Sequence, residues 1–236
     1  MTRWSLSLVA TALTIVAGCA PTTVRSTGVP AATGPLPKPE RVIVYDFAVS
    51  LDDITLNTGP AARLRRALSR DSQSEAQAEV GRQVAGKFSE ELVEAINELG
   101  LPAERASRMP SVPDNTLAVD GQFVSIDEGN RARRLVIGFG AGATEVTAHV
   151  QVYMGMPTGA IVVQEFETKA ESSKKPGGAV TMGAGAAIGA GVAVGGAASG
   201  ALETQAGVEA DAQRTARALA KQLGEFFIRE GWIAPK

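Results

Sequence analysis

The sequence is poor in the residues that most catalytic and metal-binding sites use. Its 236 residues include one cysteine and one histidine. A disulfide needs a second cysteine and a structural zinc site usually takes about four cysteine or histidine ligands, so neither forms within one chain. Only 5% of the residues are aromatic, and 23 basic against 25 acidic residues give a formal charge of −2. Without a global positive field, we expect no nucleic-acid partner.

The single cysteine ends an N-terminal segment that is typical of a secretory signal. The basic Arg3 precedes an uncharged, largely apolar run, residues 6–16, which is shorter than the roughly 20 residues that a membrane-spanning helix needs. The run ends in Val16-Ala-Gly-Cys19, which resembles the lipobox of bacterial lipoproteins. The resemblance implies that residues 1–18 are removed and that acyl chains on Cys19 bind membrane lipid. An ordinary secretory peptide or a retained anchor is the alternative.

The residue after the cysteine bears on the destination. In Gram-negative lipoproteins an aspartate there usually signals retention in the inner membrane, and this chain has Ala20. The resemblance therefore implies a protein of the bacterial cell envelope that is anchored in the inner leaflet of the outer membrane and faces the periplasm.

Residues 19–40 are predicted to be the lipidated cysteine and a Pro/Thr-rich tether. Residues 20–40 include five prolines and four threonines, a composition that favours extended geometry over a packed core. At roughly 3 Å per residue, such a tether holds a folded domain up to about 60 Å from the lipid. The folded domain is expected to cover residues 41–236.

The hydrophobic pattern of that domain predicts an α+β fold. An apolar run at 41–48 indicates a buried strand, and stripes spaced by three and four residues predict amphipathic helices over 74–99 and 205–231. Further strands are expected near 117–126, 134–137, 144–154 and 160–170, with a β-bulge at Gly121. Three consecutive strands of this series are expected to form an antiparallel meander. We therefore expect a mostly antiparallel sheet with both helices packed on one face.

Two features of this domain carry charge or chemistry. Strand 144–154 alternates cleanly and puts His149 on the polar face, which we interpret as an exposed sheet histidine, with a ligand or catalytic role as the alternative. A basic stretch precedes the first helix and is interpreted as a solvated connection, with contact to lipid phosphate as the alternative. It contains Arg63, Arg65, Arg66 and Arg70.

Two short motifs match catalytic or nucleotide-binding patterns only in part. Gly138, Gly140 and Ala143 fit G-x-G-x-x-[GA], but an alternating strand pattern follows where a dinucleotide site needs a helix. Ser172-Ser-Lys-Lys175 fits S-x-x-K without the partner motifs of penicillin-binding proteins. We interpret the first as a close-packed strand connection and the second as a solvated strand end.

Longer stretches of the chain resemble a family of bacterial envelope lipoproteins that is carried as a domain of unknown function. Besides the lipobox and the Pro/Thr segment, these are Val-Ile-Val-Tyr-Asp-Phe at 42–47, Ile-Gly-Phe-Gly-Ala-Gly-Ala-Thr-Glu-Val at 137–146 and a later Gly/Ala-rich stretch. The resemblance implies an α+β sandwich and no assigned catalysis, so no catalytic residue follows from it.

The Gly/Ala-rich stretch, residues 176–202, carries no charge and forms an insertion in the expected domain. Glycines four residues apart let helices approach closely, which favours a membrane-inserting hairpin or a self-association zipper. The candidate contacts are Gly185, Gly189, Gly191, Gly195, Gly196 and Gly200. A flexible linker is the alternative, because glycine disfavours helix and the segment has few large apolar side chains.

Taken together, these patterns predict a non-catalytic, lipid-anchored cell-envelope protein that acts as an interaction or assembly module. Its expected partners are membrane lipid at Cys19 and an envelope protein or a second copy of itself, with no metal and no cofactor. A periplasmic small-ligand-binding module is one alternative. A hydrolase using carboxylates such as Asp46, Asp52 and Asp53 is the other.

Overall fold

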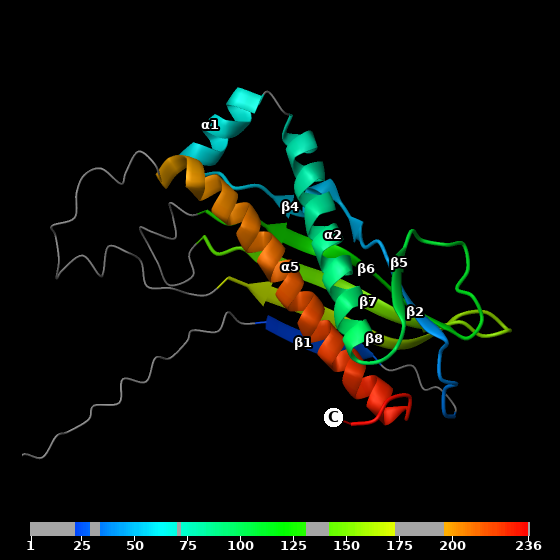
Figure 1. Cartoon of the computed structure of the whole chain (residues 1–236). Coiled ribbons are helices and arrows are strands. Elements are labelled where there is room, and N and C mark those ends of the chain that lie inside the picture. The colour runs from blue at the N-terminus through cyan, green and yellow to red at the C-terminus, as the bar shows by residue number, and fades with distance from the viewer. Residues whose placement is uncertain (1–21, 29–33, 70–71, 131–141, 173–195, 236) are drawn as a thin grey trace, which may run out of the picture.

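One open, mixed sheet lies behind two long helices (Figure 1). This computed structural model describes residues 22–28, 34–69, 72–130, 142–172 and 196–235. The strands are β1 (Thr22–Gly28), β2 (Arg41–Tyr45), β3 (Ala48–Val49), β4 (Ile54–Thr55), β5 (Ala103–Ala106), β6 (Thr116–Asp127), β7 (Glu145–Met154) and β8 (Ile161–Glu171). The helices are α1 (Pro60–Ser69), α2 (Gln73–Glu98) and α5 (Gly196–Arg229), with a 3-10 turn η1 (Leu51–Asp53). The predicted α+β class is confirmed.

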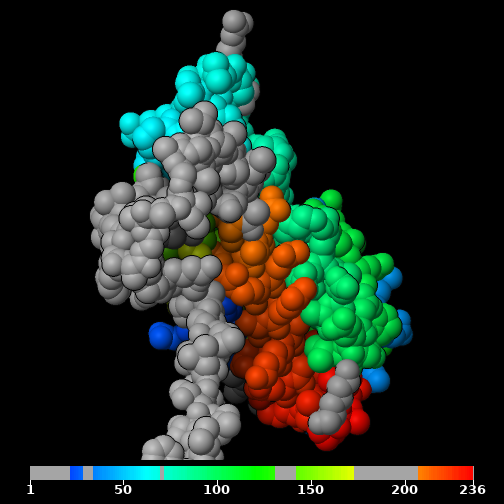
Figure 2. All heavy atoms as spheres, turned by 60° about the vertical axis from the view of Figure 1, so that its left-hand side comes forward, coloured from blue at the N-terminus to red at the C-terminus, as the bar shows by residue number. Residues whose placement is uncertain are grey.

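The sheet order is β1-β8-β7-β6-β2-β5, with β3 and β4 continuing alongside β6. The pairs β8/β7 and β7/β6 are antiparallel, as in the predicted meander, and the unpredicted strand β1 pairs antiparallel with β8. Strand β2 pairs in parallel with both β6 and β5. Helices α2 and α5 pack side by side on one face, which Figure 2 shows for α5 in orange against α2 in green. The predicted arrangement of two helices on one face is confirmed.

Helix α2 follows its predicted stripe closely. It starts at a capping box, in which the Ser72 hydroxyl accepts from the Glu75 amide and the Glu75 carboxylate accepts from the Ser72 amide. Its buried residues recur at spacings of three and four, and the helix contacts β2, β3, β4 and β5. Gly81 allows close packing, because a Cβ there would lie 3.0 Å from side-chain atoms of both Ile54 and Val49.

The predicted bulge in β6 is misplaced. The register between β6 and β7 shifts between Phe123 and Ser125, not at Gly121. Gly121 is needed for a different reason, since a Cβ there would lie 2.4 Å from the His149 carbonyl oxygen and 2.5 Å from the Phe47 ring. The glycine thus lets Phe47 pack on the strand, and the extra residue that returns Ile126 to the core follows Phe123.

The predicted tether is wrong for most of its described residues. Thr22–Gly28 is an edge strand that pairs with β8, and Val24 packs against the core. Further on, Leu36 packs on the core and its carbonyl accepts a hydrogen bond from Trp232 Nε1 at 3.3 Å. Its described residues, 22–28 and 34–40, are therefore part of the domain, because their backbone finds partners at the edge of β8 and at the C-terminal end of α5.

One helix was not predicted, and another begins earlier than predicted. The basic connection after the first strand contains helix α1, which starts at Pro60, a residue favoured at the first helical position. Helix α5 begins at Gly196, nine residues before the expected start at Gln205, so Gly196 and Gly200 belong to its first turns. The alanines of this stretch are the strongest helix formers and offset its glycines.

Several predictions fall outside the described residues. These are the signal segment, Cys19, the strand at 134–137, Gly138, Gly140, Lys175, Gly185, Gly189, Gly191 and Gly195. Within the described ranges, no helix combines the length and apolar character needed to cross a membrane.

Candidate functional site

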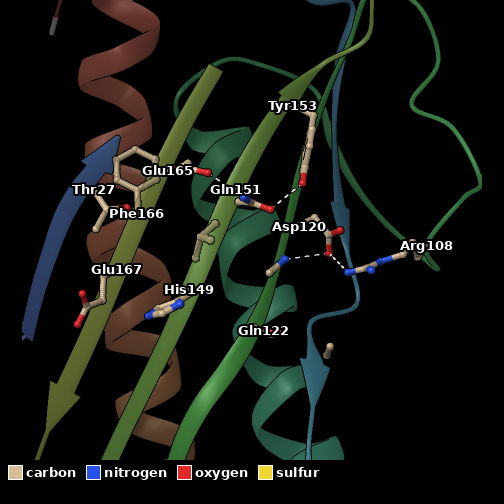
Figure 3. A pocket seen from close by; sticks show the side chains of 13 residues that line it. Thr27, Arg108, Asp120, Gln122, His149, Gln151, Tyr153, Glu165, Phe166 and Glu167 are labelled. Atoms are coloured by element: carbon tan, nitrogen blue, oxygen red, sulfur yellow. Dashed lines mark hydrogen bonds and ion pairs between the residues drawn. The ribbon is translucent and has the colours of Figure 1, made fainter. Parts of the chain in front are cut away.

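The sheet face turned away from α2 and α5 carries a hollow of about 490 Å³ (Figure 3). Strands β1, β6, β7 and β8 and the loop after β5 supply its walls. The polar side chains that line it are Thr27, Arg108, Asp120, Gln122, His149, Gln151, Tyr153, Glu165 and Glu167. Strand alternation explains their position, because the intervening residues of β6, β7 and β8 point into the core.

Sheet register sets these side chains in two rungs. In the first rung, Gln151 lies opposite Asp120 on one side and Glu165 on the other. In the second, His149 lies opposite Gln122 and Glu167. Neighbouring strands are about 4.8 Å apart, so each rung presents three polar side chains across roughly 10 Å.

Hydrogen bonds hold the first rung in place. The Tyr153 hydroxyl donates to Gln151 Oε1 at 2.7 Å, and Gln151 Nε2 donates to Glu165 Oε1 at 2.8 Å. Asp120 Oδ1 accepts from Arg108 Nη2 at 2.5 Å and from the Gly121 amide at 2.8 Å. The dashed lines of Figure 3 mark two separate groups, Glu165–Gln151–Tyr153 on β8 and β7, and Asp120 with Arg108 and the Gly121 amide. The rung is thus ordered before anything binds to it.

Two tyrosines next to Asp120 are held in the protonated form. Burial, and secondly the charge of Asp120, raise the pKa of Tyr153 above its usual range. The same two causes raise the pKa of Tyr45, which packs beneath Met109 and Val112 in a small cluster on this side of the sheet. At neutral pH both phenols are therefore protonated, and only that of Tyr153 donates a hydrogen bond among the described residues.

The second rung is open to solvent. His149 is exposed and lies on the polar face, as predicted from the alternation of β7 (Figure 3). Glu167 lies opposite it on β8, while Gln122 is exposed on β6. These groups can accept and donate hydrogen bonds to a ligand or a partner that lies across the strands.

The described part of this sheet face carries more acidic than basic side chains. Lys169 lies between Glu145 and Glu171, with its Nζ 3.0 Å from an oxygen of each, and these hydrogen bonds raise the lysine pKa. Nearby, burial raises the pKa of Asp127. The acids of the face are Glu104, Asp120, Asp127, Glu145, Glu165, Glu167 and Glu171, and its bases are Arg25, Arg41, Arg108 and Lys169.

The acids considered for hydrolysis lie elsewhere. Asp46 accepts a hydrogen bond from Arg105 Nε at 2.5 Å, near the edge strand β5. Asp52 and Asp53 belong to η1, and Asp52 is exposed. In the described ranges no group of three or more histidine, cysteine and acidic side chains has the arrangement to hold a metal ion.

From the sequence, only His149 was considered as a site residue of this hollow, although the predicted polar face of strand 144–154 also contained Gln151 and Tyr153. The alternation of β7 and β8 was sufficient to place Gln151, Tyr153 and Glu165 on the same face. No sequence signal joins Arg108 to Asp120, because that contact depends on how the loop after β5 folds back over the sheet.

The fold and the hollow define an α+β protein with an open sheet, covered by helices on one face and polar on the other. The chain belongs to the family described as Domain of unknown function (DUF4410), whose model matches residues 42–189. This membership confirms the resemblance to a family carried as a domain of unknown function. A search of curated proteins found no significant match.

Solved structures of PelC are similar to this chain at a low level. The PelC dodecamer from Paraburkholderia phytofirmans is 13% identical, with a TM-score of 0.37, over 84% of this chain and 96% of that one. A variant of the same dodecamer is 14% identical, with a TM-score of 0.34, over 78% and 96% of the two chains.

Proposed function

We propose that this chain is a non-catalytic, lipid-anchored protein of the bacterial cell envelope, held at the outer membrane, whose polar sheet face docks an envelope protein. The observation that carries the docking role is the asymmetry of the sheet. Helices cover one face, while the other presents a hollow bordered by charged side chains that hydrogen bonds already orient. A preorganised face loses little side-chain entropy when a partner binds.

The composition of the face indicates the chemistry of the partner. Its acidic side chains outnumber its basic ones among the described residues, and Glu167 and His149 are accessible in the second rung. A complementary surface would offer cationic groups and hydrogen-bond donors. We therefore expect the partner to present lysine or arginine side chains to this hollow.

Binding of a small ligand is a second candidate, and the size of the hollow favours it. Ligand pockets measure roughly 300–1,000 Å³, and this hollow lies in that range. Such pockets are, however, mostly apolar, whereas charged and polar side chains dominate here. The lining thus supports protein docking better. Carboxylate-based hydrolysis is supported less, since Arg105 already engages Asp46.

The anchor is supported by the lipobox and by the start of β1. Only Ala20 and Pro21 separate Cys19 from Thr22, the first residue of β1. Three residue steps span at most about 11 Å. A lipidated Cys19 would therefore hold the sheet directly at the membrane surface and not at the end of a long tether.

Replacing Cys19 with serine is expected to abolish acyl labelling and to release the protein from membranes, because Cys19 is the only thiol in the chain. Metabolic labelling with a fatty-acid analogue and membrane fractionation measure the two effects. Ala20→Ser is the matched control and should remain labelled and membrane-bound. Acyl labelling of the Cys19→Ser variant would refute the anchor.

A photo-crosslinking amino acid at Gln122 is expected to capture a discrete envelope protein in intact cells. Gln122 is exposed within the hollow, whereas Glu225 is exposed on α5, on the opposite side of the sheet, and serves as the control position. When the crosslinker is at position 122, the further substitution Glu167→Gln should lower the yield of crosslinked partner several-fold if the partner is cationic. Equal adduct patterns from positions 122 and 225 would contradict docking at the polar face.

A further inference from the structure

Helix α1 exposes two leucines on its outward side. Leu64 is 63% exposed and Leu68 is 75% exposed, more than any other large apolar side chain in the described residues. Ala62, the buried residue of this helix, marks its inward side. At about 100° per residue, Leu64 and Leu68 lie about 200° and 240° around the helix from Ala62. Both leucines therefore point away from the domain.

Arginines flank this apolar strip. Helix α1 contains three arginines and no acidic residue. Arg66 is partly engaged, since its Nη2 donates to the Asn57 carbonyl at 2.8 Å. Arg63 and Arg65 are exposed and lie about 100° and 300° from Ala62, one on each side of the leucines. An apolar strip between cationic borders is the arrangement of helices that lie in an anionic membrane surface.

The sheet register puts this helix at the same end of the domain as the anchor. One rung of paired residues crosses the sheet from Thr22 through Ala170, Val146 and Ile126 to Ile54. With strands about 4.8 Å apart, the rung is about 19 Å long. Thr22, at one end of this rung, follows Cys19 by three residues in the sequence. Ile54, at the other end, precedes Pro60, the first residue of α1, by six residues.

Strand β1 begins and strand β4 ends at the same edge of the sheet. Strand β4 runs parallel to β6 and exits past Asp127, at the edge of the sheet where β7 and β1 begin and β8 ends. Figure 1 shows α1 beyond this edge, next to the start of α5, and Figure 2 shows α1 at one extremity of the molecule. An acylated Cys19 would thus bring α1 to the level of the lipid headgroups.

We propose that α1 is a second membrane contact, in which Leu64 and Leu68 insert among lipids while Arg63 and Arg65 bind their phosphates. This contact rests on the proposed lipid anchor and adds an orientation to it. Two points, Cys19 and α1, would fix which end of the domain meets the bilayer. The polar sheet face would then stand upright from the membrane, open to a periplasmic partner.

The small size of the strip favours lipid over a second copy of the chain. Two leucines on a ten-residue helix offer far less area than the roughly 1,200 Å² that a stable protein interface buries. A membrane contact needs less, because the acyl chains already hold the protein at the surface and α1 adds to that binding.

The test places an environment-sensitive fluorophore on a single introduced cysteine, since acylation blocks Cys19. Full-length lipoprotein carrying Leu68→Cys is purified in detergent and reconstituted into vesicles of phosphatidylethanolamine with phosphatidylglycerol. The matched control is Lys38→Cys, which is exposed near the start of β2, at the opposite end of the sheet. Quenching by a nitroxide-labelled phospholipid is measured for both, and acyl labelling is measured on the same samples.

We expect lipid quenching at position 68 to exceed that at position 38 several-fold, with blue-shifted emission at position 68. Replacing both Arg63 and Arg65 with glutamine should make the quenching at position 68 independent of the phosphatidylglycerol content of the vesicles. Equal quenching at the two positions in an acylated protein would overturn the contact and leave the anchor intact. Protection that rises with protein concentration would assign the strip to a second copy and also overturn it. Absence of acylation refutes the anchor separately, whatever the quenching at position 68.

Discussion

Replacing Phe88 with alanine is expected to lower the free energy of unfolding by about 3–5 kcal/mol. Phe88 is fully buried on α2, where its ring centroid lies 4.6 Å from that of Phe47 and 5.5 Å from that of Phe123. The three rings connect helix α2, which carries Phe88, to the segment after β2, which carries Phe47, and to strand β6, which carries Phe123. Since Gly121 already brings Phe47 against β6, neighbouring groups have little freedom to fill the cavity.

Guanidinium denaturation of the detergent-purified protein, followed by circular dichroism, measures this loss. Leu68→Ala is the matched control, because Leu68 is 75% exposed and its truncation should change the stability by no more than about 0.5 kcal/mol. Similar losses for Phe88→Ala and Leu68→Ala would mean that the three-ring cluster does not stabilise the contact between helix and sheet.

Replacing Asp211 with alanine is expected to lower the free energy of unfolding by roughly 2–4 kcal/mol. Asp211 is fully buried on α5 and accepts a hydrogen bond from the Thr144 hydroxyl at 2.5 Å. Its other carboxylate oxygen accepts from Arg214, whose pKa burial lowers and whose Nε has no hydrogen-bond partner among the described atoms. The variant leaves a partly buried guanidinium and a buried hydroxyl without this acceptor.

A double-mutant cycle separates the ion pair from general damage to α5. Arg214→Met removes the charge that Asp211 compensates, so combining it with Asp211→Ala should recover part of the lost stability. The side chain of Arg214 is 36% exposed, which limits the expected recovery. Strictly additive losses in the double variant would show that Asp211 and Arg214 are not coupled.

Sequence patterns were most informative where burial repeats at a regular spacing. The alternation of 144–154 predicted which side chains of β7 lie in the core and that His149 lies on the polar face. The stripe of α2 predicted its length within a residue at each end. Each of these elements has a buried side and an exposed side, so apolar residues recur along its sequence with the period of the helix or strand.

The sequence was misleading where an element is stabilised mainly by distant residues. Strand β1 contains a single apolar residue that packs on the core, Val24, and the strand forms because β8 offers it an unpaired edge. The contact between Arg108 and Asp120 and the one between Leu36 and Trp232 likewise join residues from separate elements. No local period reports such pairings.

By itself, the sequence determined the α+β class, the helix-covered sheet and the polar side of β7, and it predicts the lipid anchor at Cys19. Only the tertiary structure decided that β1 begins three residues after that cysteine, that a polar hollow joins three long strands and a loop, and that α1 exposes its leucines near the edge of the sheet where β1 begins. The physical reason is that hydrophobic periodicity records how each element divides core from solvent, whereas edge pairing and the ends of the sheet arise from residues far apart in the chain.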